Sequence, residues 1–274
     1  MTEHIPSLLP PGKKWKLVWN DEFDGTELDR TKWDFRLHLL HTRYKPFTDE
    51  GAVLDGKGCL HLNLLKKDGQ YCSPHLQTGY NFMDRPGKIF YEQFGEKKEQ
   101  LTWPIAKLQK PKFMHKYGYY EIRCKLPKQE GWHCGFWLQS PIIGATLDPR
   151  ECGVEVDIME NFTRNDMISH NNHWGGYADD HQHIGSGDIK LDPTPDGFHV
   201  FGLEWNENEY VYYVDGKETW RVSEPVSQRE QFIMVTTECM CYRSSDQPDE
   251  ILKKAVLPDA FIVDYVRVFD EVKG

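Results

Sequence analysis

The feature that most limits how this chain can fold is the near absence of helical periodicity along its 274 residues. The segments with a clear pattern are short and rich in β-branched and aromatic residues, and clusters of Pro, Gly, Asp and Asn separate them. Many strands without intervening helices predict an all-β sandwich of two antiparallel sheets. The expected strands cover residues 16–20, 59–65, 118–126, 134–138, 198–205, 210–214, 231–236 and 261–269.

The clearest local prediction is a hairpin at Asp215-Gly216, because Asp-Gly suits the positive φ angles of a type I′ turn. Residues 81–113 interrupt the strand pattern with a long, basic and aromatic stretch. A loop of this length in a compact domain is usually functional or disordered. The sequence contains no internal repeat and no low-complexity linker, so we expect residues 1–274 to form a single domain.

The charge balance is acidic, with 33 basic and 43 acidic residues and no block of Lys or Arg. This composition argues against nucleic acid and anionic membranes as partners and suits a neutral one, which we expect the protein to bind as a monomer. No apolar run reaches the roughly 20 residues that span a bilayer. The start of the chain lacks a secretory signal pattern, so the protein either stays in the cell or has lost such a signal.

Residues 155–160, with the sequence Glu-Val-Asp-Ile-Met-Glu, carry three carboxylates inside a β-type segment. Side chains alternate between the two faces of a strand, so Glu155 and Asp157 share one face. Strict alternation would send Glu160 to the apolar face, where an unpaired carboxylate costs several kcal/mol. A one-residue β-bulge near residues 158–159 would restore the phase and place all three acids on one face.

Same-face positions lie roughly 6.5–7 Å apart along a strand. Inward-leaning side chains can then hold two carboxyl groups at about 5–5.5 Å, the separation used by retaining glycosidases. A merely solvated strand face is the alternative interpretation, but such a face more often mixes charges of both signs. The segment therefore indicates a sugar-cleaving site.

Several longer motifs resemble glycoside hydrolase family 16, whose members fold as a concanavalin-like β-jelly roll. The resemblance covers nearly the whole chain and includes residues 19–25 (Trp-Asn-Asp-Glu-Phe-Asp-Gly), 117–127 (Tyr-Gly-Tyr-Tyr-Glu-Ile-Arg-Cys-Lys-Leu-Pro) and 131–138 (Gly-Trp-His-Cys-Gly-Phe-Trp-Leu). The Glu-x-Asp-x-x-Glu spacing is similar to the bulged class of that family, which includes laminarinases, agarases, carrageenases and endo-galactosidases. The insertion at 81–113 and the residues His133-Cys134 depart from the usual pattern and bear on the substrate.

The resemblance implies a retaining mechanism with three acid roles. Glu155 is expected to be the nucleophile, and Asp157 to hold it and modulate its charge. Glu160 is expected to be the general acid that later acts as base, and this division requires environments that push the two pKa values apart. The alternative for Glu160 is an ordinary surface position before Asn161.

Aromatic planes stack on the apolar faces of sugar rings, so Trp132, Trp137 and Trp174 are candidate platforms. For Trp137 a core position is an equal alternative. His173 is a candidate hydrogen-bond partner for a sugar hydroxyl, or a residue that only braces its loop.

Two histidine pairs, at residues 170 and 173 and at residues 181 and 183, offer nitrogen ligands, but neither spacing falls on a predicted helix with a matching carboxylate. Catalysis by the three acids requires no cofactor. The resemblance implies a structural calcium with Glu22 and Asp264 as oxygen donors.

The expected activity is that of a retaining endo-glycosidase on internal β-linkages of a polysaccharide or oligosaccharide, with a β-1,3-glucan favoured by the laminarinase-like pattern. An endo-acting hydrolase of β-galactan, agar or carrageenan is one alternative, and a transglycosylase that uses the same site is another. A non-catalytic lectin is disfavoured, because a binding module has no need of three adjacent carboxylates that repel one another.

Overall fold

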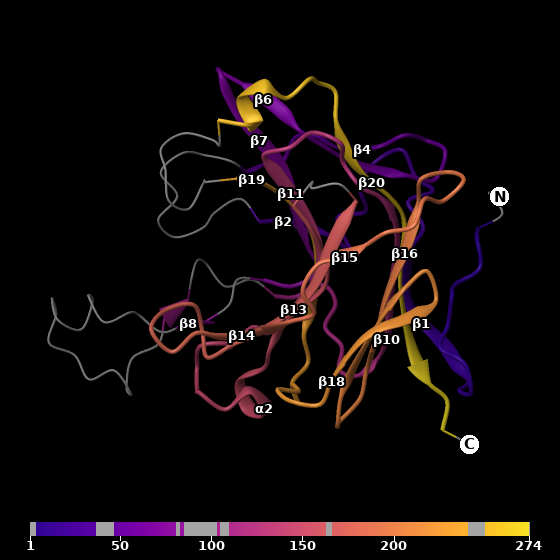
Figure 1. Ribbon diagram of the computed structural model, residues 1–274, viewed down its shortest axis with the longest axis vertical. Helices are drawn as coiled ribbons and strands as arrows, with labels where there is room; N and C mark the ends of the chain where they lie inside the picture. Colours follow the sequence, from indigo (N-terminus) through magenta and orange to yellow (C-terminus); the bar gives the residue numbers. More distant parts are fainter. Residues whose placement is uncertain are drawn as a thin grey trace, which may run out of the picture.

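The computed structural model describes residues 4–36, 47–80, 83–84, 103–104, 110–162, 166–240 and 250–273, with the backbone alone at 83–84 and 103–104. Two large sheets lie face to face, which confirms the predicted all-β jelly-roll sandwich (Figure 1). Helical structure in the described ranges is limited to α2 (Pro149–Cys152) and the 3-10 turn η2 (Leu252–Lys254).

The first sheet has eight strands, which are β1 (Trp15–Asp21), β4 (Ala52–Leu54), β5 (Leu60–Asn63), β10 (Gly118–Lys125), β16 (His199–Trp205), β17 (Tyr210–Val214), β18 (Lys217–Val222) and β20 (Ala260–Glu271). Their order is β18-β17-β16-β10-β20-β5-β4, with β1 also paired to β20. The predicted hairpin joins β17 to β18, and both turn residues have positive φ, +49° at Asp215 and +76° at Gly216.

The second sheet has ten strands, which are β2 (Asp34–Phe35), β3 (Phe47–Thr48), β6 (Leu65–Lys67), β7 (Gln70–Gln77), β11 (Trp132–Gln139), β12 (Glu155–Asn161), β13 (Met167–Trp174), β14 (Gln182–Gly185), β15 (Ile189–Lys190) and β19 (Phe232–Cys239). Its main path is β14-β13-β12-β11-β19-β7-β2. All its pairings are antiparallel except that of β3 with β7. A separate two-stranded pair, β8 (Met83–Asp84) and β9 (Trp103–Pro104), completes the described strands.

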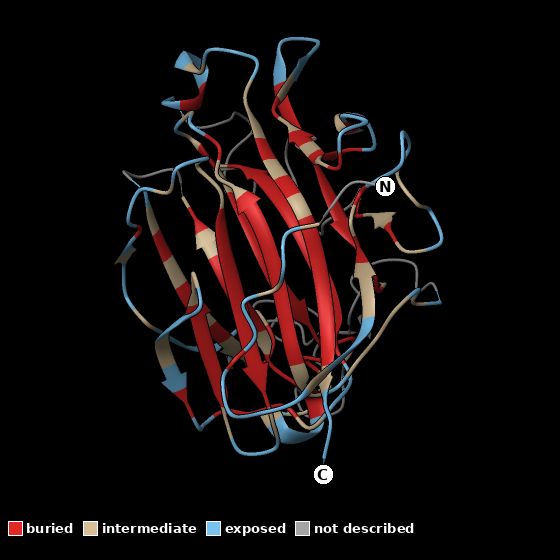
Figure 2. Cartoon of the chain, turned by 90° about the vertical axis from the view of Figure 1, so that its right-hand side faces the viewer, coloured by how far each residue is buried: buried red, intermediate tan, exposed pale blue. Residues whose placement is uncertain are grey.

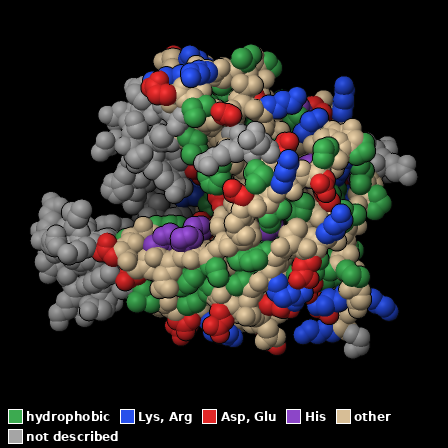
Figure 3. Space-filling model, in the orientation of Figure 1, with side chains coloured by type: hydrophobic (Ala, Val, Ile, Leu, Met, Phe, Trp, Pro, Cys, Tyr) green, Lys and Arg blue, Asp and Glu red, His purple; other side chains and the backbone are tan. Residues whose placement is uncertain are grey.

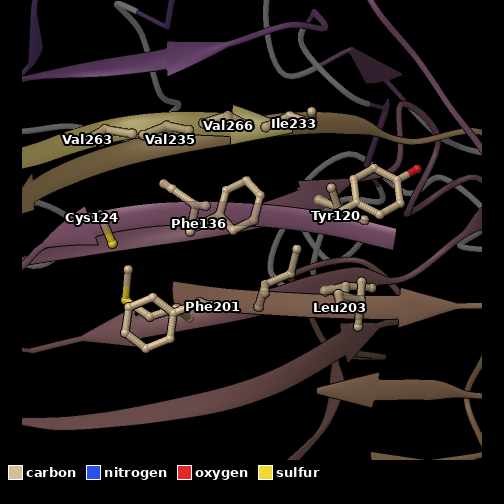
Figure 4. Packing of buried hydrophobic residues seen from close by; sticks show 14 of the residues in the cluster. Tyr120, Cys124, Phe136, Phe201, Leu203, Ile233, Val235, Val263 and Val266 are labelled. Carbon is tan, nitrogen blue, oxygen red and sulfur yellow. The ribbon is translucent and has the colours of Figure 1, made fainter. Parts of the chain in front are cut away.

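The main core fills the space between the two sheets. Alternate residues of β10, such as Tyr120 and Cys124, meet Phe136 of β11 and Val235 of β19, and Phe201 of β16 packs beside them (Figure 4). All five are fully buried, so each sheet contributes one apolar face. Because strands alternate their side chains, the other face of each sheet is available for other interactions.

The outer face of the eight-stranded sheet is covered by the N-terminal segment. The Leu8 backbone N–H donates to Glu121 Oε2 at 2.9 Å, and Arg267 Nη1 donates to the Ile5 carbonyl at 2.8 Å. Figure 2 shows this sheet face on, with its central strands buried along most of their length. The outer face of the ten-stranded sheet therefore remains as the place for a site.

The six cysteines within the described ranges are free thiols, and five of them are buried; Cys241 lies outside these ranges. No helix among the described residues is long and apolar enough to cross a membrane. The segment 81–113, singled out from the sequence, lies mostly outside the described residues.

Candidate active site

The β-bulge predicted near residues 158–159 is present in β12. Against β11, Met159 pairs with Phe136 and Asp157 pairs with Trp137, so Ile158 is an extra residue on β12. The pairing with β13 shows the same one-residue shift, between Asp157 and Glu160.

The bulge gives β12 two consecutive core residues. Ile158 and Met159 are both fully buried in the main core. The phase shift returns Glu160 to the outer face with Glu155 and Asp157, as the sequence predicted. We call the outer face of the ten-stranded sheet around these three carboxylates the acid face. Glu155 and Glu160 are half-buried there, and Asp157 is 3% exposed.

Two donors fix the orientation of the Glu155 carboxylate. Gln139 Nε2 donates to Glu155 Oε2 at 2.8 Å, and the Tyr177 hydroxyl donates to the same oxygen. Burial, together with the neighbouring Glu155 charge, raises the pKa of Tyr177 well above its ordinary value. The phenol therefore stays protonated and remains a donor at neutral pH.

Glu160 has a different environment from Glu155. Burial raises the pKa of the Glu160 carboxyl well above its ordinary range, and the nearby Asp157 carboxylate adds to the rise. Asn171 Nδ2 donates to Glu160 Oε2 at 2.6 Å, which orients the group and opposes the rise in pKa. The result is a carboxyl that holds a proton at higher pH than a solvent-exposed glutamate does.

His173 lies on the acid face beside Asp157. Its Nε2 is 3.4 Å from Asp157 Oδ2, and its Nδ1 is 2.9 Å from His181 Nε2. The rings of His173 and His181 stack with centroids 5.1 Å apart, and His183 stacks on the same group. Histidine side chains accordingly gather at one place over β13 and β14 (Figure 3).

The two histidines at positions 170 and 173 do not form a pair. An odd spacing in a strand places them on opposite faces, and His170 is fully buried on the core side. Burial lowers the pKa of His170 to about 4, so the ring is neutral at physiological pH. Its Nδ1 donates to the carbonyl of Ile158, the extra residue of the bulge, at 2.7 Å. His170 thus holds the bulge from the core side.

The structure corrects the placement of two predicted sugar platforms. Trp132 shares the parity of Phe136 and is fully buried in a small cluster with residues such as Leu252. Trp174 follows His173 by one position, so it points to the opposite face and packs against the main core. Neither ring lies on the acid face.

Trp137 does lie on the acid face, because it pairs with Asp157 across the two strands. Its ring is 8% exposed and its Nε1 donates to Thr236 Oγ1 at 2.9 Å. Met234 and Phe232 pack against it, so the ring supports the floor of the site and offers little free surface.

The two residues expected to hold a structural calcium each contact an arginine. Both Glu22 oxygens accept from Arg267, at 2.8 and 2.7 Å. Asp264 Oδ2 accepts from a different arginine, Arg123, at 2.5 Å. Each carboxylate already faces a cation of the protein, and the calcium site stays a prediction.

Three contacts of the site were not found from the sequence. Gln139, Tyr177 and Asn171 supply the donors to the two outer glutamates. Strand parity offered a signal for Gln139, which is two residues beyond Trp137, and for Asn171, two residues before His173. Tyr177 lies in a loop, where no periodicity indicates the direction of a side chain.

The chain is similar in sequence to several named enzymes. The chain is 27% identical over 217 residues to glucan endo-1,3-beta-glucosidase A1 of Niallia circulans, with 76% of this chain but only 29% of the relative covered. It is 26% identical to a beta-glucanase of Rhodothermus marinus, covering 93% of the chain and 85% of the relative. Beta-porphyranase B of Phocaeicola plebeius is 25% identical, and the match covers 92% of this chain and 84% of that relative.

Among solved structures, the catalytic domain of an endo-1,3-beta-glucanase (laminarinase) from Thermotoga petrophila RKU-1 has a similar fold. Its TM-score is 0.67 with 24% sequence identity, and the match covers 95% of this chain and 100% of that one.

The β-sandwich and the three carboxylates on its acid face together define the class of the protein, which is a glycoside hydrolase. A model of the glycosyl hydrolases family 16 matches residues 92–245, more than half of the chain. The chain therefore belongs to this family, and the resemblance seen in the sequence is confirmed.

Proposed function

We propose that the protein is a retaining endo-glycosidase that hydrolyses internal β-glycosidic bonds of a polysaccharide, with a β-1,3-glucan as the favoured substrate. The observation that carries the proposal is the arrangement of the carboxylates on the bulged strand β12. Two donors hold Glu155 there, and burial raises the pKa of Glu160. The names of the glucanase relatives support the choice of glucan.

The two glutamates divide the chemistry in the proposed reaction. Glu155 attacks the anomeric carbon as the glycosidic C–O bond breaks, and Glu160 gives its proton to the leaving oxygen. A glycosyl ester on Glu155 results. Glu160, now ionised, takes a proton from water as that water attacks the same carbon, which frees Glu155 and retains the anomeric configuration.

Asp157 and His173 assist the two glutamates in this proposal. Asp157 lies between the two glutamates along the strand, and its charge favours the protonated form of Glu160. His173, whose Nε2 lies 3.4 Å from Asp157 Oδ2, is proposed to position that carboxylate and to contact a sugar hydroxyl. Trp137 is proposed to support the sugar that binds beside Asp157.

A second candidate is an endo-acting hydrolase of agar-type galactans. The beta-porphyranase relative supports it, because its match covers more than nine tenths of this chain. A transglycosylase with the same residues differs only in whether water or a second sugar resolves the ester on Glu155.

We also propose that residues 1–274 form a single catalytic domain that acts as a monomer on a neutral polysaccharide. One main core joins both sheets, and the net charge of −10 is unsuited to anionic partners. Size-exclusion chromatography with light scattering checks the expected monomer mass.

The decisive experiment is hydrolysis of laminarin, mixed-linkage glucan, agarose, porphyran, carrageenan and galactan, with the products sized and their anomers followed by NMR. The proposal expects internal cleavage of laminarin with initial release of the β-anomer. Preferred cleavage of a galactan selects the second candidate. Initial release of the α-anomer would overturn the retaining mechanism, and longer products with added acceptor sugar would indicate transglycosylation.

A further inference from the structure

The acid face brings together three groups that differ in chemistry and can share one ligand. Ligand atoms of Glu155, Asp157 and His173 all lie within 4.8 Å of one another. It is the one such group found among the residues that the structure describes. Two carboxylates and an imidazole form a mixed oxygen and nitrogen donor set, whereas the proposed hydrolysis needs no metal ion.

The spacing of one pair of these ligand atoms suits a small metal ion. Two ligand atoms bound at 2.0–2.1 Å to a tetrahedral zinc ion are roughly 3.4 Å apart. His173 Nε2 and Asp157 Oδ2 are already separated by 3.4 Å. This separation is longer than an ordinary charge-assisted hydrogen bond, which is about 2.7–2.9 Å. The pair is therefore spaced for a shared ion better than for direct contact.

A neighbouring residue supports the same interpretation. A histidine that binds metal through one ring nitrogen usually donates its other N–H to a fixed partner, which sets the tautomer. With Nε2 directed at Asp157, the Nδ1 of His173 lies 2.9 Å from His181 Nε2. His181 thus occupies the supporting position, outside the three proposed ligands.

We infer that Glu155, Asp157 and His173 form a binding site for a divalent transition-metal ion such as Zn²⁺, and that this ion and the sugar substrate exclude each other. An imidazole ligand selects zinc, copper or nickel, whereas calcium and magnesium prefer oxygen ligands alone. Two adjacent carboxylates need a positive charge, and a dication supplies it. Glu155 is also the proposed nucleophile, so a bound metal blocks the reaction.

The first test is direct binding of ZnCl₂ alone, measured by isothermal titration calorimetry in a non-chelating buffer. One ion per chain is expected, and His173→Gln should weaken binding at least tenfold. His115→Gln is the matched control, because His115 Nε2 lies 2.8 Å from Asp270 in another His–Asp pair outside the site. That variant should bind zinc as the parent does.

A second pair of variants tests whether His181 supports the metal ligand His173, with the neighbouring His183 as the control. Loss of such a partner commonly costs 10–100-fold in metal affinity. His181→Ala should therefore weaken zinc binding by about tenfold or more. His183→Ala removes a ring that stacks on His173, at 5.7 Å, and on His181, at 6.2 Å, with no hydrogen bond to the His173 ring, and should change binding by less than about threefold.

Absence of saturable zinc binding by the parent would overturn the inference, as would binding that persists unchanged in folded His173→Gln. If that variant does not fold, unchanged zinc affinity in His181→Ala would overturn the inference. Calcium should not displace the ion. Because binding is measured without substrate, a chain that binds zinc yet cleaves no polysaccharide refutes only the proposed function. An active chain that binds no zinc refutes only the metal site.

Where hydrolysis is observed, zinc should inhibit it competitively, and a saturating oligosaccharide should raise the apparent dissociation constant for zinc. Inhibition that leaves the apparent KM unchanged would place the ion elsewhere.

Discussion

At the residue scale, the contrast between Glu155 and Glu160 is the most informative property of the site. Both are half-buried on the same face of one strand. They differ in their partners, because Glu155 accepts from Gln139 and Tyr177, whereas Glu160 accepts from Asn171 and lies close to other carboxylates. Burial and the neighbouring Asp157 carboxylate raise the pKa of Glu160, so this residue can hold the proton that the general acid of the proposed reaction must supply.

Glu155→Gln should lower turnover by at least about a thousandfold, because the amide keeps the shape of the side chain but cannot form the ester with the sugar. Folding should be unaffected, since Gln still accepts from Tyr177. Steady-state hydrolysis together with thermal unfolding checks both points. The exposed Glu207→Gln is the control and should retain parent activity. Turnover of the Glu155 variant within tenfold of the parent would exclude it as the nucleophile.

Glu160→Ala should harm substrates with poor leaving groups far more than activated aryl glycosides, because only the former need protonation at the leaving oxygen. Added azide should restore turnover and yield a glycosyl azide of retained configuration. Rates on both substrate types, with and without azide, provide the measurement. An equal loss on both without rescue would assign the acid role to another residue.

The raised pKa of Glu160 also has a cost in stability. In the unfolded chain this group titrates near its ordinary pKa, about 4.3. Between that value and the higher pKa of the folded state, only the folded state holds the proton, so the free energy of unfolding falls as pH rises. Glu160→Gln should therefore have a higher Tm than the parent at pH 8.

The gain in Tm should disappear near pH 4, where the parent glutamate is protonated in both states. Each kcal/mol moves the Tm of a large domain by about 2–4 °C, so the expected difference is a few degrees. Scanning calorimetry of both proteins and of Glu207→Gln at several pH values tests this. A Tm difference that does not change with pH would contradict it.

At the element scale, the bulge of β12 shows what a pattern along one strand can predict. The position of the extra residue followed from two facts, that apolar residues avoid water and that Glu160 avoids the core. The pattern could not indicate which groups would satisfy the freed backbone. The Ile158 carbonyl accepts from the ring of His170, which lies on the neighbouring strand β13. The pairing of these two strands cannot be derived from the pattern along either one.

Deleting Met159 should produce a plain alternating strand with the three acids still on one face. The strand beyond the deletion must slip by one residue against both neighbours. We expect a folded protein with a lower Tm and activity reduced by roughly a hundredfold, because displacements of about 1 Å cost that much. Kinetics and thermal unfolding measure the two effects.

Met159→Leu is the matched control for the deletion, since it keeps both the residue count and the volume of a fully buried side chain. Its cost should stay below about 1.5 kcal/mol. Full activity of the deletion variant, or an equal loss in Met159→Leu, would refute the role of the bulge in spacing the acids.

At the scale of the whole molecule, the sandwich was predictable because each strand carries its own alternation. The lateral neighbours of each strand were not, since many pairings satisfy the same pattern. The error at Trp132 and Trp174 has another origin: their residue type suggested sugar binding, while strand phase placed them on the core side. The sequence also did not indicate the arginine partners of Glu22 and Asp264, which reach them through the pairing of β20 with β1 and with β10.

Removing residues 1–10 should lower stability without changing kcat, because this segment binds the sheet opposite the acid face. The deletion removes three hydrogen bonds. One runs from the Leu8 N–H to Glu121, and the other two run from Arg267 to the Ile5 carbonyl and to the Ser7 hydroxyl. A typical hydrogen bond contributes about 0.5–1.5 kcal/mol net, so losing these three bonds should cost about 2–4 kcal/mol. Urea unfolding and kinetics on the truncated chain test this, with Ser7→Ala as a milder comparison. A fall in kcat of the folded truncated chain would show coupling between the two outer faces.

The placement of all three acids on one strand has a consequence for how such a protein diversifies. The spacing of the reacting groups is set by seven consecutive residues of backbone, β12 itself, so relative movement of the two sheets leaves it unchanged. Loops around the acid face can then lengthen, shorten or exchange their side chains without retuning the chemistry. Descendants of one ancestor can acquire new polysaccharides by altering the rim alone. Relatives named for a glucan and for porphyran both match more than nine tenths of this chain, as such a history would leave them.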